Sequence, residues 1–272
     1  MQSNFIPYKN SSIHYCLYGK GVQFVFCFHG YGGNAESFAF LEERLGEDYT
    51  LAAIDLPFHG QTEWNDGLNF EPAELVEIIK QIKAIIQPNS PSTDQKITLL
   101  GYSMGGRVAL HLLQIIPEAL RRVVLIAPDG LHKSLWYAFS TQTWLGNKVF
   151  RRAMHKPARF FWVLKMAERY KLVHASIVKV THYYMDDATK RSELYKRWTT
   201  MRRFKPNLGL LKKIIPQNKI AVRFLFGKYD NIILSEKSVI FKDDENIEIN
   251  IIEAGHRLMQ EKYSGEITRL FY

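Results

Sequence analysis

The sequence is poor in the residues and patterns that several classes of protein require. It holds two cysteines in 272 residues, Cys16 and Cys27, and both lie in apolar, strand-like runs. A disulfide framework is not indicated, and we expect two small buried side chains in a reducing compartment. No run approaches the roughly 18 apolar residues of a membrane span. Met1–Asn10 has neither a basic start nor an apolar core, so we predict no secretory signal and a cytoplasmic location.

The patterns that bind cofactors are also missing from the sequence. The nine histidines show no metal-ligand spacing, and neither a Walker phosphate loop nor Gly-x-Gly-x-x-Gly occurs. We therefore predict no metal and no cofactor.

Negative charge is scarce in one part of the chain. From Asp129 to Lys205 there are 17 Lys/Arg and 5 Asp/Glu, a net charge of +12, against 19 and 22 in the remainder. This excess favours contact with an anionic membrane surface, or with a substrate carboxylate or phosphate held by an arginine. No nucleic-acid-binding motif accompanies the charge, so we expect no specific nucleic-acid binding.

Strand-like and helix-like segments alternate along most of the chain. Strands are predicted at 11–18, 22–28, 49–56, 96–100, 122–127, 219–227 and 247–252, and helices at 34–45, 72–86, 108–116, 235–241 and 258–270. We expect the first two strands to form a hairpin through Gly19–Gly21. The segment 129–206 has helical periodicity, many aromatic residues and no convincing strand.

This alternation predicts an α/β fold with a mostly parallel, doubly wound sheet. We expect a core domain of residues 1–128 and 207–272, with residues 129–206 inserted as a helical cap. Ligands of such sheets bind at the carboxyl ends of the strands. Six polar residues follow predicted strands and should meet there: His29, Asp55, Ser103, Asp129, Asp230 and His256.

The stretch Gly101-Tyr102-Ser103-Met104-Gly105 stands between an apolar strand and a helix. This context is typical of a nucleophile elbow, a turn so tight that it strains the serine and exposes its hydroxyl. Side chains two positions before and after the serine would collide there, which explains Gly101 and Gly105. The start of the following helix can stabilise negative charge that develops at the site.

The chain resembles the α/β-hydrolase fold enzymes that carry a cap, among them carboxylesterases and lipases. The matching motifs are His29-Gly30-Tyr31-Gly32-Gly33, Asp55-Leu56-Pro57-Phe58-His59-Gly60-Gln61-Thr62, Gly101-Tyr102-Ser103-Met104-Gly105-Gly106, Gly227-Lys228-Tyr229-Asp230 and Gly255-His256. The resemblance implies the doubly wound sheet, with the cap inserted after the sixth strand. One residue departs from the pattern, since Phe58 stands where relatives often have glycine.

Family enzymes place nucleophile, acid and histidine in the chain order that Ser103, Asp230 and His256 follow. The resemblance implies that His256 is the base, that Asp230 orients it, and that the backbone N–H groups of Tyr31 and Met104 form the oxyanion hole. Asp129 is the competing acid, because some family members place the carboxylate there. The remaining polar residues, His29, Asp55 and His59, are predicted to order their loops.

The favoured function is hydrolysis of a small-molecule carboxylic ester, or a related acyl substrate, through an acyl-serine intermediate. Two alternatives keep the same residues: a lyase of the menaquinone-pathway type acting on an anionic substrate, and a C–C bond hydrolase. A third alternative is a ligand-binding protein without activity, which would have no need of a serine, a histidine and an acid together.

Overall fold

A computed structural model describes residues 1–87, 95–132, 134–170, 186–242 and 244–272. The chain divides into two compact units. We call Met1–Asp66, Phe70–His132 and Arg203–Tyr272 the sheet unit, and Gly67–Asn69 with Lys133–Arg202 the helical unit. The insertion predicted at 129–206 overlaps the helical unit, and its role as a cap stays a prediction.

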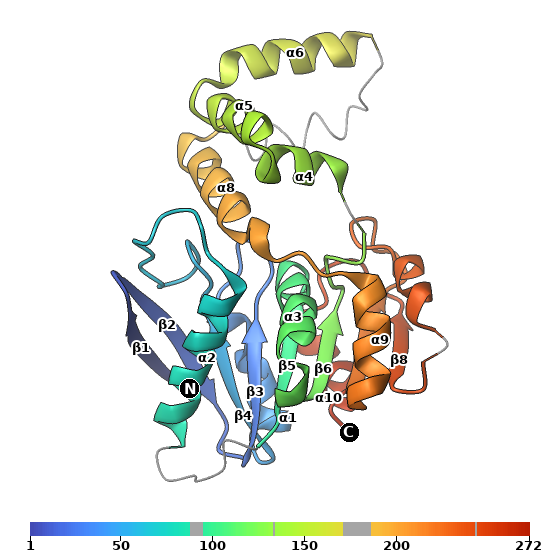
Figure 1. The fold of residues 1–272 in the computed structure, drawn as a ribbon. Helices are drawn as coiled ribbons and strands as arrows, with labels where there is room; N and C mark the ends of the chain where they lie inside the picture. The colour runs from blue at the N-terminus through green and yellow to red at the C-terminus, as the bar shows by residue number, and fades with distance from the viewer. Residues whose placement is uncertain (88–94, 133, 171–185, 243) are drawn as a thin grey trace. The chain divides into compact units, whose positions relative to one another are not determined.

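The sheet unit is built on one eight-stranded sheet (Figure 1). The strands are β1 (Gln2–Tyr8), β2 (Ser11–Tyr18), β3 (Gln23–Phe28), β4 (Tyr49–Ile54), β5 (Ile97–Tyr102), β6 (Leu120–Ile126), β7 (Ala221–Gly227) and β8 (Ile247–Ile252). They lie in the order β1-β2-β4-β3-β5-β6-β7-β8. The pairs β1–β2 and β2–β4 are antiparallel, and every later pair is parallel. The predicted mostly parallel sheet is therefore confirmed.

The hairpin predicted between 11–18 and 22–28 is wrong. Strand β2 forms its hairpin with β1, and on its other side it pairs with β4 from Tyr15↔Ile54 to Tyr18↔Leu51. Strand β4 thus lies between β2 and β3. The sequence between the two strands suggested a turn, but Gly19 and Gly21 instead pack against the backbone of 46–49, where a Cβ on Gly21 would lie 1.9 Å from the Asp48 carbonyl carbon.

Helices cover both faces of the sheet. On one face lie α2 (Pro72–Ile86), α3 (Met104–Ile115) and α9 (Leu208–Asn218), and on the other lie α1 (Glu42–Leu45) and α10 (Ser264–Arg269) (Figure 1). Short 3₁₀ segments complete the unit: η1 (Ala35–Leu41), η2 (Pro117–Ala119), η4 (Ser235–Phe241) and η5 (Glu261–Tyr263). A further 3₁₀ segment, η3 (Met201–Arg203), spans the boundary between the two units. The helix predicted over 72–86 has these bounds, whereas the C-terminal helix predicted over 258–270 is shorter.

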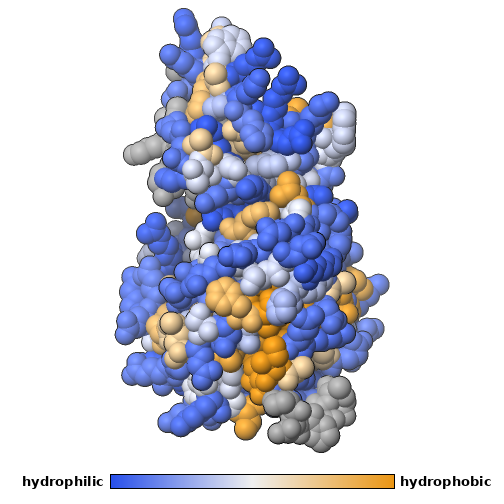
Figure 2. Space-filling view, turned by 90° about the vertical axis from the view of Figure 1, so that its left-hand side faces the viewer, coloured by the Kyte–Doolittle hydropathy of each residue, from blue (hydrophilic) through white to orange (hydrophobic). Residues whose placement is uncertain are grey.

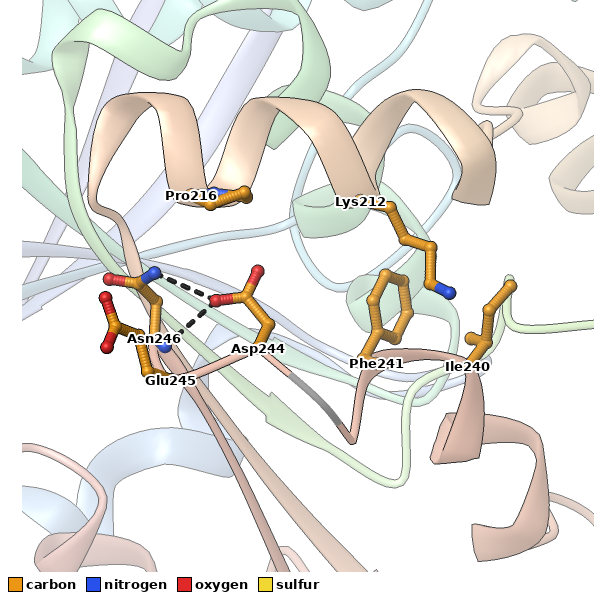
Figure 3. Close-up of a pocket in the computed structure, with 7 residues that line it drawn as sticks. All are labelled: Lys212, Pro216, Ile240, Phe241, Asp244, Glu245 and Asn246. Carbon is orange, nitrogen blue, oxygen red and sulfur yellow. Dashed lines mark hydrogen bonds between the residues drawn. The ribbon is translucent and has the colours of Figure 1, made fainter.

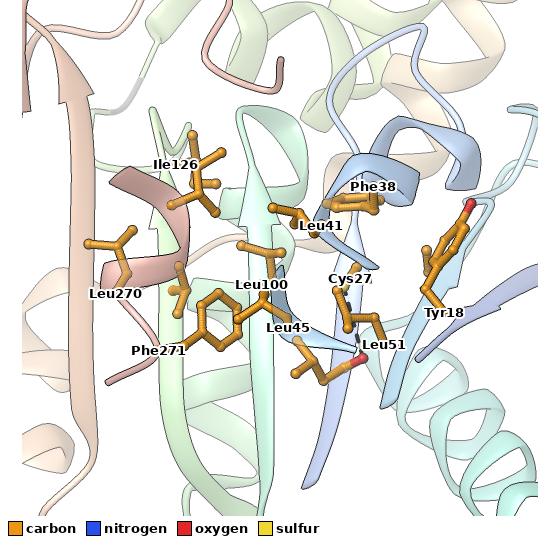
Figure 4. Close-up of a cluster of buried hydrophobic side chains, with 14 of the residues drawn as sticks. Tyr18, Cys27, Phe38, Leu41, Leu45, Leu51, Leu100, Ile126, Leu270 and Phe271 are labelled. Atoms are coloured by element: carbon orange, nitrogen blue, oxygen red, sulfur yellow. Dashed lines mark hydrogen bonds between the residues drawn. The ribbon is translucent and has the colours of Figure 1, made fainter. Parts of the chain in front are cut away.

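The core beneath η1, α1 and α10 consists of large apolar side chains from both layers (Figure 4). Strands contribute Leu51, Leu100 and Ile126, η1 contributes Phe38 and the residue after α10 contributes Leu270, all nearly without solvent exposure. Cys16 and Cys27 are buried and unbridged, as predicted. Burial raises the pKa of the Cys27 thiol well above its ordinary value, so the thiol stays protonated.

The helical unit contains α4 (Leu135–Gln142), α5 (Trp144–His155), α6 (Pro157–Arg169) and α8 (Ala188–Thr200), which follow the sixth strand. Its small core forms around Met154 and Tyr195, with Phe150, Phe160 and Phe161 packed against them. The Asn147 side chain links three helices: its amide donates to the Ser140 carbonyl and to Thr199 Oγ1, and it accepts from the Tyr195 hydroxyl.

Hydrophilic residues cover most of the surface seen from the β1–β2 side, with smaller apolar groups between them (Figure 2). Within the residues that the structure describes, no helix combines the length and the apolar character needed to cross a bilayer.

Replacing Leu100 by alanine tests this core. Leu100 is fully buried, whereas Ile85 on α2 is 56% exposed. We expect Leu100→Ala to lower the free energy of unfolding by about 2–5 kcal/mol and Ile85→Ala by much less, because only the first leaves a cavity. Urea unfolding followed by circular dichroism measures both. Equal losses for the two variants would contradict this packing.

Candidate active site

Ser103 occupies a strained turn between β5 and α3. Its φ of 50° and ψ of −114° lie outside the helical and extended regions that L-residues prefer. Two backbone hydrogen bonds to the end of β6 and the residues after it hold the turn. The Ser103 N–H donates to the Ile126 carbonyl at 3.0 Å, and the Ser103 carbonyl accepts from the Asp129 N–H at 2.9 Å. The backbone has the features predicted for a nucleophile elbow, in which strain is supported by the surrounding structure.

Three glycines allow this turn to form. A Cβ on Gly101 would lie 2.4 Å from the Gly105 carbonyl oxygen, one on Gly105 would lie 1.9 Å from the Phe28 carbonyl oxygen, and one on Gly106 would lie 2.4 Å from Pro128. No side chain fits at these distances. Helix α3 can therefore start directly against the ends of β3 and β6 only because these positions lack a side chain.

The structure brings Ser103, His256 and Asp230 into one hydrogen-bonded line. Ser103 Oγ lies 3.1 Å from His256 Nε2, and His256 Nδ1 donates to Asp230 Oδ2 at 2.8 Å. The Asp230 side chain has no solvent exposure and that of His256 is 18% exposed. An imidazole oriented by a buried carboxylate can take a proton from a serine hydroxyl in this arrangement.

The two candidate acids have different partners. The second oxygen of Asp230 accepts from the backbone N–H groups of Ile232 and Ile233 at 2.7 and 2.9 Å, which fixes the orientation of the carboxylate. Asp129 Oδ2 instead lies 3.4 Å from an Arg107 guanidinium nitrogen. Of the two carboxylates, the one that contacts His256 is that of Asp230.

Tyr102 is a residue of the site that the motif alone did not single out. Its hydroxyl donates to the His256 carbonyl at 3.1 Å, and its ring stacks on the imidazole with centroids 5.6 Å apart. Burial and the nearby Asp230 carboxylate raise the pKa of Tyr102 to about 12, so its hydroxyl stays protonated and can donate. No pattern in the sequence around Tyr102 indicated this contact.

The loop after β3 lies beside the serine. A Cβ on Gly30 would lie 3.3 Å from Ser103 Cβ and 3.0 Å from the Tyr102 ring. Met104 is the first residue of α3, and the N–H of a first helical residue has no acceptor within its own helix. The role of the Tyr31 and Met104 N–H groups as oxyanion donors stays a prediction.

His29 fixes the position of this loop. Its Nδ1 donates to the Gly30 carbonyl at 2.8 Å and its Nε2 accepts from the Leu56 N–H at 3.1 Å. Both nitrogens of this fully buried ring are therefore engaged with backbone groups, as a residue that orders a loop requires.

Asp55 organises the next loop in the same way. Its carboxylate accepts from the backbone N–H groups of Ala35 at 2.6 Å and Gln61 at 2.8 Å. Phe58, in the same loop, has a φ of 63°, the left-handed conformation that glycine adopts without strain. The residue at which the chain departs from the family pattern thus has a backbone conformation that suits glycine.

A second serine–histidine–aspartate line crosses the antiparallel end of the sheet. His14 Nδ1 donates to Asp55 Oδ2 at 2.7 Å, and His14 Nε2 lies 2.9 Å from Ser3 Oγ. Ser3 belongs to the regular part of β1 and pairs with Cys16 across the hairpin. It has neither a strained backbone nor a following helix start, so this line joins strands and lacks the features of a nucleophile elbow.

A hollow of about 410 Å³ lies between α9 and the segment from η4 to β8 (Figure 3). None of Ser103, His256 and Asp230 lines it; its lining residues are Lys212, Pro216, Ile240, Phe241, Asp244, Glu245 and Asn246. In the described part of the chain, no three His, Cys, Asp or Glu residues are grouped as a metal ion would require.

A sequence model of the α/β hydrolase fold matches residues 23–160. The chain belongs to the α/β hydrolase fold family. The matched residues include the loop after β3, the turn after β4 and the elbow at Ser103, so the family assignment rests on the segments that form one half of the site.

Two curated relatives share part of this α/β hydrolase fold chain. Over 117 residues it is 32% identical to a pimeloyl-(acyl-carrier protein) methyl ester esterase of Salmonella heidelberg, covering 43% of this chain and 41% of that protein. Over 119 residues it is 29% identical to the dihydrolipoyllysine-residue acetyltransferase component of the acetoin cleaving system of Cupriavidus necator, covering 43% and 30%. The match spans less than half of either relative.

Solved structures show the same fold over the whole chain. A thermophilic esterase from Thermogutta terrifontis superposes with a TM-score of 0.66 at 16% identity, covering 100% of this chain and 97% of that chain. At this identity the likeness establishes the fold alone.

Adding a methyl group at Gly105 tests the elbow. A Cβ there would lie 1.9 Å from a backbone oxygen, whereas a Cβ on Gly265 would meet nothing within 4 Å. We expect Gly105→Ala to lower the thermal midpoint by several degrees or to prevent folding, and Gly265→Ala to leave it unchanged or raise it, because alanine favours helix. Differential scanning calorimetry measures both, and an unaltered midpoint for Gly105→Ala would refute the close approach of α3.

Proposed function

We propose that this protein is a serine hydrolase that cleaves a carboxylic ester, with Ser103, His256 and Asp230 as its catalytic triad. The observation that carries the proposal is the unbroken line from Ser103 Oγ to His256 Nε2 at 3.1 Å and from His256 Nδ1 to Asp230 Oδ2 at 2.8 Å. Family membership and the ester-cleaving relative from Salmonella heidelberg support it.

The first half of the reaction forms an acyl-serine. Ser103 Oγ attacks the ester carbonyl carbon while His256 Nε2 takes the hydroxyl proton. The imidazolium then gives this proton to the departing alcohol oxygen, and the acyl group remains on the serine. Asp230 holds the Nδ1–H tautomer and stabilises the imidazolium, and the two backbone amides bound to its other oxygen keep its carboxylate oriented.

The second half releases the acid. A water molecule loses a proton to His256 Nε2 and attacks the acyl carbonyl, and the proton returns to Ser103 Oγ as the carboxylic acid leaves. In both halves the tetrahedral intermediate carries an oxyanion, for which we propose the N–H groups of Tyr31 and Met104 as donors. The closeness of Gly30 to Ser103 supports this part of the proposal.

The segment 129–206 is the proposed cap over the core domain, residues 1–128 and 207–272. Caps of this kind select the substrate, and we propose a small-molecule ester. An anionic substrate would find complementary charge in this segment, whose net charge is +12.

Labelling with a fluorophosphonate probe tests the nucleophile. Such probes phosphonylate a serine that is activated by a neighbouring base, so we expect the wild type to be labelled and Ser103→Ala not to be. The control variant is Ser3→Ala, which removes the serine of the second line and should keep full labelling. Labelling that survives in Ser103→Ala and disappears in Ser3→Ala would reverse the assignment.

Turnover of short p-nitrophenyl esters separates an enzyme from a binding protein. We expect kcat/KM to fall by about 10³-fold or more in Ser103→Ala and His256→Ala. Inert esters together with turnover of an anionic enolpyruvyl substrate would identify the lyase instead.

The acid is tested by a matched pair of substitutions. We expect Asp230→Asn to lower kcat by about 10³-fold, because an amide does not stabilise the imidazolium, and Asp129→Asn to lower it by less than about tenfold. Steady-state kinetics on the same ester gives both values. A larger loss in Asp129→Asn would assign the acid to the other strand end.

A further inference from the structure

Helix α5 presents one face that is both apolar and cationic. Trp144, Leu145, Lys148, Val149 and Arg152 recur at the spacing of one helical face, and all are exposed, Trp144 by 76%. The opposite face carries Asn147, Phe150 and Met154 and packs into the helical unit. The exposed face of α5 is therefore not needed for the packing of the helical unit.

Helix α4 adds more exposed apolar surface beside it. Leu135 is 84% exposed and Trp136 is 67% exposed, and Phe139 lies against the Trp136 ring with centroids 6.3 Å apart. The hydrophobic effect disfavours such large side chains in water, and three of them stand within five residues.

The two helices are held together tightly. Only Thr143 separates them, and its hydroxyl donates to the Phe139 carbonyl at 2.8 Å. A Cβ on Gly146 would lie 2.0 Å from that same carbonyl oxygen, so the end of α4 rests directly on the first turn of α5. We take the exposed residues of these two packed helices together and call them the α4–α5 surface.

The charge of this region is predominantly positive. Residues 134–169, which span α4 to α6, contain seven Lys/Arg and one Asp/Glu, Glu168. Lys148, Arg151 and Arg152 are exposed on α5, and Lys148 Nζ lies 4.8 Å from the Trp144 ring centroid. A cation over an indole is stabilised by the ring while its other protons stay available for an anion.

We propose that the α4–α5 surface docks onto an anionic phospholipid bilayer. Tryptophan prefers the headgroup level of a membrane, where its ring is apolar and its N–H stays hydrogen-bonded. Trp136 and Trp144 insert at that level with Leu135 and Leu145, and Lys148 and Arg152 pair with lipid phosphates. Apolar insertion and anionic-lipid attraction together are the two signals that stable peripheral binding needs.

The mixture of side chains favours a bilayer over other anionic partners. A double-stranded nucleic acid or another polyanion without free bases would contact the cations and leave the apolar side chains in water, and a single strand could stack on the tryptophans but would leave Leu135 and Leu145 in water. A second copy of the chain would cover the apolar residues but would bring two cationic faces together.

Vesicle flotation tests the proposal without any substrate, so its outcome is separate from that of the labelling experiment. The vesicles are phosphatidylcholine alone, and phosphatidylcholine mixed with an equal amount of phosphatidylglycerol. We expect the wild type to float with the mixed vesicles only, and less of it at high salt, because salt screens the attraction. We expect Lys148→Glu/Arg152→Glu and Trp136→Ser/Trp144→Ser each to weaken binding by about tenfold or more.

Matched variants of the sheet unit serve as controls. Lys212→Glu/Lys213→Glu reverses two exposed charges on α9, and Val22→Ser/Ile85→Ser removes two exposed apolar side chains. Both should bind vesicles within about twofold of the wild type, since the substituted residues lie outside the surface that we propose contacts the bilayer. Circular dichroism melts confirm that each variant is folded.

Several outcomes would overturn the proposal. They are absence of flotation by the wild type, equal weakening in test and control variants, and binding to heparin that depends on Lys148 and Arg152 but not on the tryptophans. A concentration-dependent dimer that Trp136→Ser/Trp144→Ser abolishes, without vesicle binding by the wild type, would assign the surface to a second copy.

Discussion

The close approach of helix α3 to the ends of three strands is the constraint on which the site depends. Gly105 lies against the Phe28 carbonyl, Gly106 against Pro128 and Gly101 against the Gly105 carbonyl. This contact leaves no room for an ordinary turn, so Ser103 takes a positive φ and its side chain stands clear of the sheet. If these three positions carried side chains, the helix would have to start farther from the sheet, and Ser103 could adopt an unstrained backbone conformation.

Among the residues that the structure describes, two serine–histidine–aspartate lines occur, one at Ser103 and one at Ser3, and their comparison shows what hydrogen bonds alone do not supply. Both have a serine within hydrogen-bond reach of a histidine and a carboxylate on its other nitrogen. Ser103 is placed at a strained turn before a helix, whereas Ser3 lies within the regular part of β1. The backbone around the serine, rather than the triplet of side chains, distinguishes a candidate nucleophile from a polar link between strands.

Much of this fold could be predicted from the sequence where the signal was local. The helix over 72–86 was predicted with its bounds because its apolar residues recur at helical spacing. The polar residues after strands marked the sheet edge at which Ser103, Asp230 and His256 meet. In each of these cases the pattern repeats within one segment or follows directly from strand direction.

Other features depended on contacts between distant segments. Whether β2 pairs with β3 or β4 is decided by the whole sheet, and the alternation in 11–18 carries no record of its partner. Strand β1 was missed because its apolar residues are few. The contact of Tyr102 with His256 joins residues 154 positions apart, and no pattern around either residue indicates it. The packing of α4 on α5 likewise depends on the close contact of Gly146 with the Phe139 carbonyl, which no sequence pattern indicates.

The order of strands in the chain also has a consequence for how the protein is made. Asp230 follows β7 and His256 follows β8, the last strand of the sheet, whereas Ser103 follows β5. In a growing chain Ser103 is therefore made well before Asp230 and His256. Because β7 and β8 come last in the chain order of the strands, the hydrogen-bonded line can form only after both have been synthesised and have joined the sheet through β6. A chain that ends before β8 therefore contains Ser103 but lacks His256, so it cannot form the hydrogen-bonded line.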